Sequence, residues 1–362
     1  MDKLKKELDF VRGDKVKIEP INWLWPNRIP KGMLSIFAGI GGVSKSTLSL
    51  YMAAQITTGR PFIDESTTSR KPGDVIILSA EDIPGKIIIP RLIAMDANIS
   101  RIFIIKGSKV TLPDGTIGFV GIDDLSKGGD LNLLDDMIKH CPNPQLAIVD
   151  PYTAYMGQAD SNDNIKVRSF LRPLSEMASD HNLAILGITH LNKNQDLAAD
   201  FRILGSVGQQ NAARMVWLIA SDPDDFDRRY FVWLKGNLAP KHTGLAYRLV
   251  NVNVPTPDGE ITPQPACNFE RDPILLTAQE LLAPQKKSQG RPRKQTDASE
   301  WLESFLSEGP VDSKIIYDEG EALGYSQRTL NRVKKSMEIL AIPIRTKIND
   351  RVLRWEWRLK SS

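Results

Sequence analysis

The sequence predicts an α/β protein in which a mostly parallel sheet is followed by a small, separate C-terminal domain. Three observations predict this organisation. Apolar strand patterns alternate with helical patterns over most of the 362 residues, a glycine-rich segment joins the first strand to the first helix, and the charge balance changes near residue 284. Strands that alternate with helices favour parallel pairing, with helices on both faces of the sheet.

In chain order, residues 1–31 form a polar lead-in and residues 32–284 form the α/β core. Apolar runs rich in Ile, Val and Leu predict its buried strands, which are MLSIFAG, DVIILSAED, RIFIIKG, QLAIVD, LAILGITH, RMVWLIA and YFVWLKG. Apolar residues at helical spacing predict helices at 45–56, 131–139 and 167–180. Residues 244–271 predict a closing hairpin around the Pro-Asp-Gly turn at Pro257–Gly259.

The C-terminal part is expected to be a linker and a second domain. Residues 285–296, QKKSQGRPRKQT, carry five positive charges and no large apolar side chain, which is typical of a linker. Within residues 297–362 we expect three helices, at 297–307, 314–323 and 327–338, and then two strands, at 340–347 and 351–359. Three helices followed by a two-stranded hairpin is the order of a winged-helix domain, a form of helix-turn-helix.

Composition excludes several classes of protein. The apolar fraction of 41% and the charged fraction of 25% are those of a soluble globular chain. Two cysteines are too few for a disulfide scaffold, and no apolar run of about 18 residues or secretory signal is present, so we expect a cytoplasmic protein without a membrane partner. From Gln285 onward 16 Lys+Arg face 11 Asp+Glu, a net of +5, whereas the first 284 residues carry 31 and 33, a net of −2. The basic tail favours a search for nucleic-acid contacts there.

The segment GIGGVSKST between the first strand and the first helix carries the main chemical signal. It approximates the phosphate-loop pattern G-x-x-x-x-G-K-[ST], in which glycines let backbone N–H groups wrap phosphates at a helix N-terminus. Lys45 would reach the β- and γ-phosphates and Ser46 would ligate Mg²⁺, so ATP and Mg²⁺ are the expected cofactors. The expected nucleotide-binding residues are Gly39, Gly41, Gly42, Val43, Ser44, Lys45, Ser46 and Thr47.

One position departs from the pattern, because Ser44 stands where the pattern has glycine. If this position requires a positive φ, serine costs about 1–3 kcal/mol of strain, which would weaken nucleotide binding and bring hydrolysis into question. The alternative is a purely structural glycine-rich turn.

Polar residues follow three of the predicted strands. Glu81 lies just past the second strand, Asp150 ends LAIVD, and His190 ends LAILGITH. An ATPase needs a carboxylate to orient Mg²⁺, a group that positions water, and a polar sensor of the γ-phosphate. The carboxyl ends of parallel strands share one edge of the sheet, where open α/β sheets bind ligands. A single acid after a strand is more often a helix cap, but three such residues after a phosphate loop favour a catalytic site.

With these residues in view, the stretch from Trp23 to about Val250 resembles the RecA-like P-loop ATPases of the RepA/AAA_25 group, which includes hexameric replicative helicases. The resemblance is carried by WLWPNRIPKG, SAED, IVDPYTAYMG, THLNK, RILGSVGQQNAAR, ASDPDDFDRRYFVWLKGNLAP and GLAYRL. It implies a RecA-like core that self-associates into a hexameric ring, with ATP between subunits and single-stranded DNA passing through the ring.

The resemblance also implies roles for individual residues. Glu81 matches the glutamate that polarises the attacking water, Asp150 the Walker B aspartate, and His190 the sensor after the fifth strand. Lys235, in WLKGN, matches a lysine that such rings insert into the neighbouring subunit's site. Many relatives have Lys-x-Arg there, whereas this chain has Asn237 in place of the arginine. The second cation is therefore absent or is supplied by Arg214, Arg228 or Arg229.

Contacts with DNA are expected in both domains. In RecA-like proteins the loops after the fourth and fifth strands face the channel, which here means residues 155–166 and 192–206. Lys193 and Arg202 are the candidates for phosphate contacts there, and a solvated surface charge is the alternative for each.

The tail resembles the C-terminal modules that accompany such ATPases in mobile elements. In its third helix Leu330, Val333 and Met337 share one face, which leaves basic residues to enter a DNA groove from the other. The candidate DNA contacts are Arg328, Arg332 and Lys335 on this helix and Arg351 in the hairpin. A basic amphipathic helix that contacts protein is the alternative. Residues 290–294, GRPRK, are similar to the core of an AT-hook, but a plain tether is the simpler interpretation.

The expected function is an ATP-dependent DNA motor, a helicase or a recombination ATPase, of a plasmid, phage or other mobile element. One alternative is an ATP-switched DNA-binding regulator of replication with little hydrolysis, and another is a recombinase-like filament protein.

Overall fold

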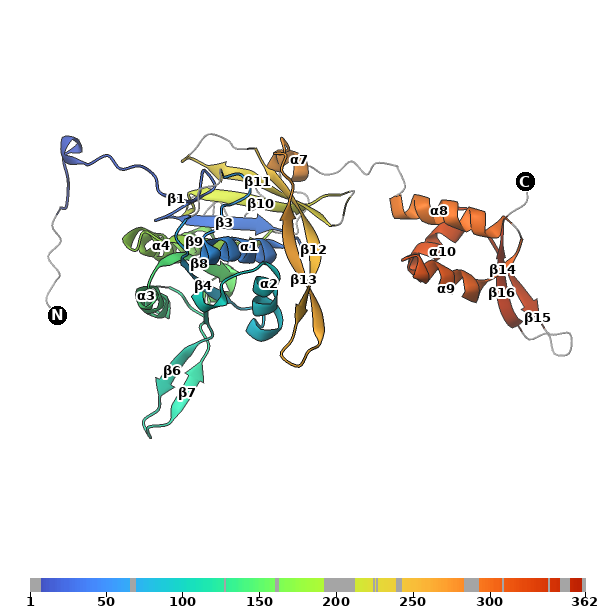
Figure 1. Cartoon of the computed structure of the whole chain (residues 1–362), viewed down its shortest axis with the longest axis horizontal. Coiled ribbons are helices and arrows are strands. Elements are labelled where there is room, and N and C mark those ends of the chain that lie inside the picture. The colour runs from blue at the N-terminus through green and yellow to red at the C-terminus, as the bar shows by residue number, and fades with distance from the viewer. Residues whose placement is uncertain are drawn as a thin grey trace. The chain divides into compact units, whose positions relative to one another are not determined.

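The computed structural model describes residues 8–65, 70–126, 128–159, 163–191, 212–223, 225, 227–238, 243–282, 293–307, 309–337, 339–345 and 352–359. The chain divides into two compact units, Met1–Pro284 and Gln285–Ser362 (Figure 1). No helix among the described residues is long and apolar enough to cross a membrane.

The first unit contains the α/β core. Its strands are β1 (Trp23–Trp25), β2 (Ile29–Pro30), β3 (Leu34–Gly39), β4 (Asp74–Ser79), β5 (Ile102–Ile105), β6 (Ser108–Thr111), β7 (Ile117–Val120), β8 (Pro144–Asp150), β9 (Ala184–His190), β10 (Met215–Ser221), β11 (Arg228–Gly236), β12 (Leu245–Pro255) and β13 (Ile261–Phe269). Its helices are α1 (Lys45–Thr58), α2 (Ile89–Ala94), α3 (Leu131–His140), α4 (Asn164–Asp180) and α7 (Ala278–Leu282), with short turns η1 (Gly13–Lys15), η2 (Pro84–Ile88), η3 (Ile99–Arg101) and η4 (Tyr152–Tyr155).

Nine strands form one sheet in the order β13-β12-β11-β10-β3-β9-β8-β4-β5. The run from β10 to β5 is parallel, and β11, β12 and β13 extend it as antiparallel strands. The central strands are apolar throughout because helices cover both faces, as parallel sheets require. The predicted α/β class with a mostly parallel sheet is confirmed, and it is consistent with a RecA-like P-loop core.

Each face of the sheet has its own hydrophobic cluster. Leu48, Met52 and Leu92 of α1 and α2 are buried against one face. Leu134 and Phe170 of α3 and α4 are buried against the other. The two helical layers hold the strands rigidly, so the strand ends form a fixed frame for side chains at the edge of the sheet.

The core begins earlier than the predicted boundary at residue 32. Trp25 and Ile29, in the expected lead-in 1–31, are fully buried. The Trp25 ring stacks on Phe62, with ring centroids 4.3 Å apart, and on Phe231, at 5.4 Å. The cation Arg28 lies over Trp217, 5.1 Å from the ring centroid, and pairs with a carboxylate. The cluster WLWPNR is therefore part of the core, because its aromatic rings gain more from burial than its polar neighbours lose.

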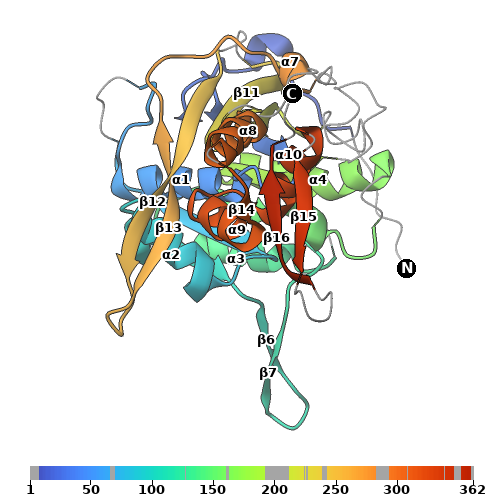
Figure 2. The same ribbon diagram turned by 90° about the vertical axis from the view of Figure 1, so that its right-hand side faces the viewer.

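Two hairpins extend beyond the helical layers of the first unit (Figures 1 and 2). The predicted one is β12–β13, which turns at Pro257–Gly259. The other, β6–β7, pairs Ser108 with Val120 and was not expected from the sequence. It exposes Ile117 and Phe119, so it lacks the buried apolar face that marks a strand in the sequence.

The second unit contains α8 (Arg293–Leu306), β14 (Val311–Asp312), α9 (Ser313–Ala322), α10 (Gln327–Ser336), β15 (Leu340–Arg345) and β16 (Val352–Arg358) (Figure 2). Its three strands pair in the order β14-β16-β15. Leu302, Leu330 and Trp357 lie at its buried centre. The short strand β14 adds a third strand to the expected hairpin.

The boundary of the expected linker also shifts. Helix α8 begins at Arg293, so the last four residues of the predicted linker 285–296 are helical and the boundary at 297 is wrong. Arg, Lys and Gln are good helix formers, and Pro292 stands just before the first turn, where proline is tolerated. Charge alone therefore did not distinguish a tether from the first turn of a helix.

Candidate nucleotide site

The loop between β3 and α1 has the backbone of a phosphate cradle. Gly39 closes β3 so tightly that a Cβ there would lie 2.4 Å from the carbonyl oxygen of Ile219, so only glycine fits. Gly42 has a φ of 80° and Ser44 a φ of 69°, both in the left-handed region. Ser44 is also the N-cap of α1, and its side chain makes no capping bond to the helix. The positive φ that the pattern reserves for glycine is thus adopted here by serine.

Lys45 is buried at the centre of the loop. Its Nζ donates to the carbonyl oxygens of Gly39, at 2.9 Å, and Ile40, at 2.8 Å. It also lies 3.3 Å from Nδ1 of His190. Burial lowers the pKa of Lys45 to about 8, with Asp150 and Glu81 acting in the opposite direction. A cation held among backbone carbonyls is poised to exchange them for phosphate oxygens.

Ser46 and Asp150 form the candidate Mg²⁺ site. Asp150 ends β8 and is buried, and the Ser46 side chain hydrogen-bonds to its carboxylate. Burial raises the pKa of Asp150 to about 6, and the negative charges of Asp82 and Glu81 raise it further. A hydroxyl and a carboxylate are oxygen ligands of the kind Mg²⁺ takes, so the residues present fit this cation.

Glu81 and His190 meet at the same edge of the sheet. His190 stands opposite Gly39 in the β3–β9 pairing, and Asp150 opposite Ser79 in the β4–β8 pairing. His190 Nε2 lies 3.6 Å from Glu81 Oε1, and both side chains are substantially exposed, by 44% and 61%. His190 thus bridges the buried Lys45 on one side and the solvent-facing Glu81 on the other. The structure brings Lys45, Ser46, Asp150, Glu81 and His190 together, as the strand-end pattern predicts.

Lys235 lies apart from this group. It pairs with Val216 on β10, which in turn pairs with Ile36, so it is displaced from Gly39 toward the opposite end of the sheet. Burial lowers the pKa of Lys235. Its place, two strands away from β3, does not complete the site of its own subunit.

The three arginines considered as substitutes for the missing cation differ in availability. Arg228 donates to Glu270, at 2.7 Å, and pairs with Asp222, so its charge is already matched. Arg229 is buried. Arg214 is exposed and immediately precedes β10, beside the pairing of Met215 with Gly236. Arg214 and Lys235 therefore belong to the same end of the sheet.

The expected DNA contacts are only partly described. Lys193, Arg202 and Arg351 lie outside the described residues, as do the side chains of Arg328 and Lys335. Arg332 is exposed on α10. The opposite face of α10 buries Leu330 and Val333, and Met337 packs against them, as the spacing predicts.

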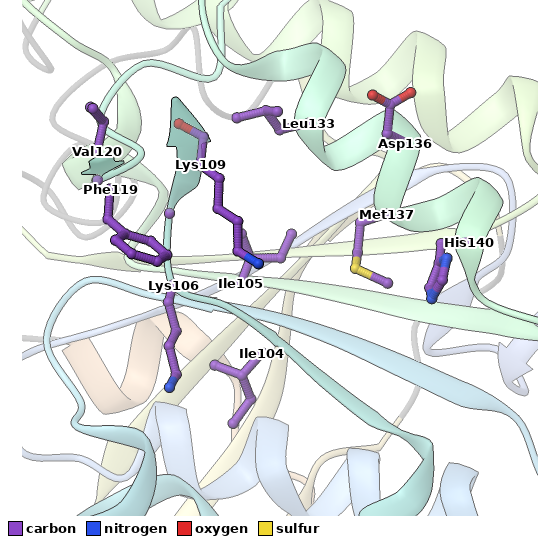
Figure 3. A pocket seen from close by; sticks show the side chains of 13 residues that line it. Ile104, Ile105, Lys106, Lys109, Phe119, Val120, Leu133, Asp136, Met137 and His140 are labelled. Carbon is purple, nitrogen blue, oxygen red and sulfur yellow. The ribbon is translucent and has the colours of Figure 1, made fainter. Parts of the chain in front are cut away.

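A cavity of 790 Å³ lies away from the phosphate loop (Figure 3). It is lined by the end of β5, the base of the β6–β7 hairpin and α3. Lys106 and Lys109 border it with Phe119, and Met137 and His140 reach it from α3. None of the expected nucleotide residues lines it, so it is not part of the site described above.

Sequence reasoning missed one residue of the loop's surroundings. Tyr247, near the start of β12, is fully buried, and its hydroxyl lies 2.8 Å from Ser44 Oγ. The two residues are 203 positions apart, and no local pattern joins them. The available signal was the segment GLAYRL, a short β-type run with one polar atom on an aromatic ring.

The comparisons with known proteins agree with the family resemblance. A family model described as AAA domain, AAA_25, matches residues 2–196, more than half of the chain. No curated protein matches the chain. Among solved structures, one of the ATPase domain of a helicase is similar at 12% sequence identity and a TM-score of 0.45, covering 61% of this chain and 82% of that chain. A TM-score of that size carries no conclusion about function.

Proposed function

The chain belongs to the AAA_25 family, and from that premise we propose that it is an ATP-dependent DNA motor, a helicase or recombination ATPase of a mobile element, phage or plasmid. The observation that carries the proposal is the edge of the sheet where Lys45 touches His190, His190 approaches Glu81, and Ser46 binds Asp150. A phosphate cradle, a metal-ligand pair and an exposed carboxylate at one edge are the parts that ATP hydrolysis needs.

In this proposal the chain's own residues divide the work. Backbone N–H groups of the loop and Lys45 bind the phosphates, and Ser46 and Asp150 would hold Mg²⁺. When bound, Mg²⁺ neutralises charge on the phosphate oxygens. Glu81 accepts the proton of the attacking water, since it is the exposed carboxylate. His190 contacts both Lys45 and Glu81, so it reports the state of the phosphate end to the group that positions water.

The proposed assembly is a ring in which Lys235 and Arg214 complete a neighbouring site. Lys235 lies too far along the sheet to serve its own phosphate loop, so it would act in the neighbouring subunit's site. Arg214, exposed at the same end, would supply the second cation that Asn237 lacks, because Arg228 is already ion-paired and Arg229 is buried. The hexameric number comes from the family resemblance.

The second unit is proposed to bind duplex DNA as a winged-helix domain. Its order of helix, short strand, two helices and two strands supports this, as does Arg332 on the exposed face of α10. Lys193 and Arg202 of the first unit remain candidates for single-stranded DNA contacts.

ATP turnover with and without single-stranded DNA tests the motor directly. The full chain is expected to hydrolyse Mg·ATP faster with DNA, because channel loops that bind DNA would couple to the site. Binding of ATP with no turnover, with or without DNA, would support the ATP-switched regulator instead, an alternative that the strained Ser44 favours. Open helical assemblies in place of closed particles of fixed mass would support the recombinase-like filament.

A further inference from the structure

Ser44 occupies a left-handed backbone conformation that side chains with a Cβ disfavour. Its φ of 69° and ψ of 27° place the carbonyl and N–H of the loop where α1 begins. A residue held in this region persists only where its surroundings determine it strongly. The neighbouring loop glycine, Gly42, reaches φ 80° without that cost. Something outside the loop must therefore stabilise Ser44.

Tyr247 is the residue that meets Ser44. It lies on β12, paired with Arg229 on β11 and with Phe269 on β13, so its backbone is fixed from both sides. Its ring packs on Phe269, with centroids 5.1 Å apart. The ring is fully buried, and only the hydroxyl reaches the loop, 2.8 Å from Ser44 Oγ.

The direction of the hydrogen bond follows from the serine's second contact. Ser44 Oγ also donates to the carbonyl oxygen of Val43. Its one proton is then used, so the phenol of Tyr247 donates to the serine oxygen. Burial raises the pKa of Tyr247 well above its ordinary value, so the phenol keeps the proton it donates. A buried phenol also loses free energy if it has no partner, so each hydroxyl satisfies the other.

We propose that Tyr247 is a positioning residue of the nucleotide site, whose hydrogen bond holds Ser44 in the left-handed bend that glycine would adopt unaided. The inference rests on the proposed function, since the bend matters because it aims the loop's N–H groups at phosphate. Ser44 and Tyr247 thus act as one unit, and removing the tyrosine hydroxyl alone leaves a strained serine without its support.

A double-mutant cycle tests the pairing. Mg·ATP binding is measured by calorimetry on the full-length wild type, Tyr247→Phe, Ser44→Gly and the double variant. Losing one buried hydrogen bond should weaken ATP binding about 2- to 12-fold in Tyr247→Phe. In the Ser44→Gly background the same change should alter affinity by less than about 2-fold, because glycine needs no support. Tyr51→Phe is the matched control, since Tyr51 packs on the same Phe269 but its hydroxyl bonds elsewhere.

The outcomes separate this inference from the function it rests on. Equal losses from Tyr247→Phe in both backgrounds, or no loss in either, overturn the pairing while ATP binding stands. Wild-type protein that binds Mg·ATP no better than Lys45→Ala overturns the proposed function and the inference with it. Melting curves for the same four proteins separate general unfolding from loop positioning, because a merely structural tyrosine would lower the melting temperature equally in both serine and glycine backgrounds.

Discussion

Replacing Glu81 with glutamine should separate hydrolysis from both stability and binding. The Glu81 side chain is 61% exposed, and its contact with His190, at 3.6 Å, is longer than a hydrogen bond. Substituting an exposed side chain that lacks a close partner changes the free energy of unfolding by no more than about 0.5 kcal/mol. Glutamine keeps the size of the side chain but cannot accept a proton from water.

The expected effect on turnover is much larger. A general base contributes about 10²- to 10⁴-fold to a rate, so kcat should fall by that factor, or about 2.7–5.4 kcal/mol of activation free energy. The dissociation constant for Mg·ATP should stay within about 3-fold of wild type, because the carboxylate lies beyond the loop that holds the phosphates. Single-turnover hydrolysis with saturating ATP, calorimetry and a melting curve measure the three quantities.

Asp82→Asn provides the matched control, since it changes the adjacent carboxylate in the same way. Asp82 pairs with Arg91, at 3.4 Å, whereas Glu81 is the carboxylate that approaches His190, so kcat should change by less than about 3-fold. Turnover by Glu81→Gln within 3-fold of wild type would refute the assignment of Glu81 as the base. An equal loss of turnover in Asp82→Asn would show that general electrostatics at this edge, rather than one base, sets the rate.

The same geometry makes three further predictions. Mg·ATP affinity should be greatest between about pH 6 and pH 8, because Asp150 takes up a proton as the pH falls through about 6 and Lys45 loses its proton as the pH rises through about 8; calorimetry across pH 5–9 that finds a flat profile would contradict these shifts. Lys235→Ala and Lys45→Ala should each be inactive, yet an equal mixture assembled together should recover roughly a quarter of wild-type turnover, because random rings pair an intact loop with an intact neighbouring lysine at that frequency; no recovery would argue against a site shared between subunits. Arg332→Ala should weaken duplex DNA binding similarly for all sequences and reduce the salt-dependence slope by about 1, and an unchanged slope measured by fluorescence anisotropy would remove Arg332 from the DNA surface.

The parts of the site that sequence could predict are those governed by local pattern. The phosphate loop is continuous in the chain, and parallel strands place their carboxyl ends at one edge, so Lys45, Asp150 and His190 could be expected to meet. The order of strands and helices likewise follows from periods of two and 3.6 residues. These rules need no knowledge of which strands are neighbours.

The parts that sequence could not predict depend on contacts between distant segments. Tyr247 meets Ser44 across 203 positions because β12 is the third strand from β3, an order that no local pattern specifies. Trp25 belongs to the core because Phe62 and Phe231 stack on it. Lys235 carries no local sign of which end of the sheet it reaches. In each case the deciding free energy comes from packing between elements rather than from propensity.

Steady-state ATP turnover by the full-length wild type and Lys45→Ala, each with and without single-stranded DNA, tests the proposed motor most directly. Lys45 is the buried cation of the loop, held by the carbonyl oxygens of Gly39 and Ile40. We expect Mg²⁺-dependent turnover by the wild type that DNA accelerates, and turnover by Lys45→Ala at the level of a protein-free control. Equal turnover by the two proteins would contradict the assignment of this loop as the site of hydrolysis.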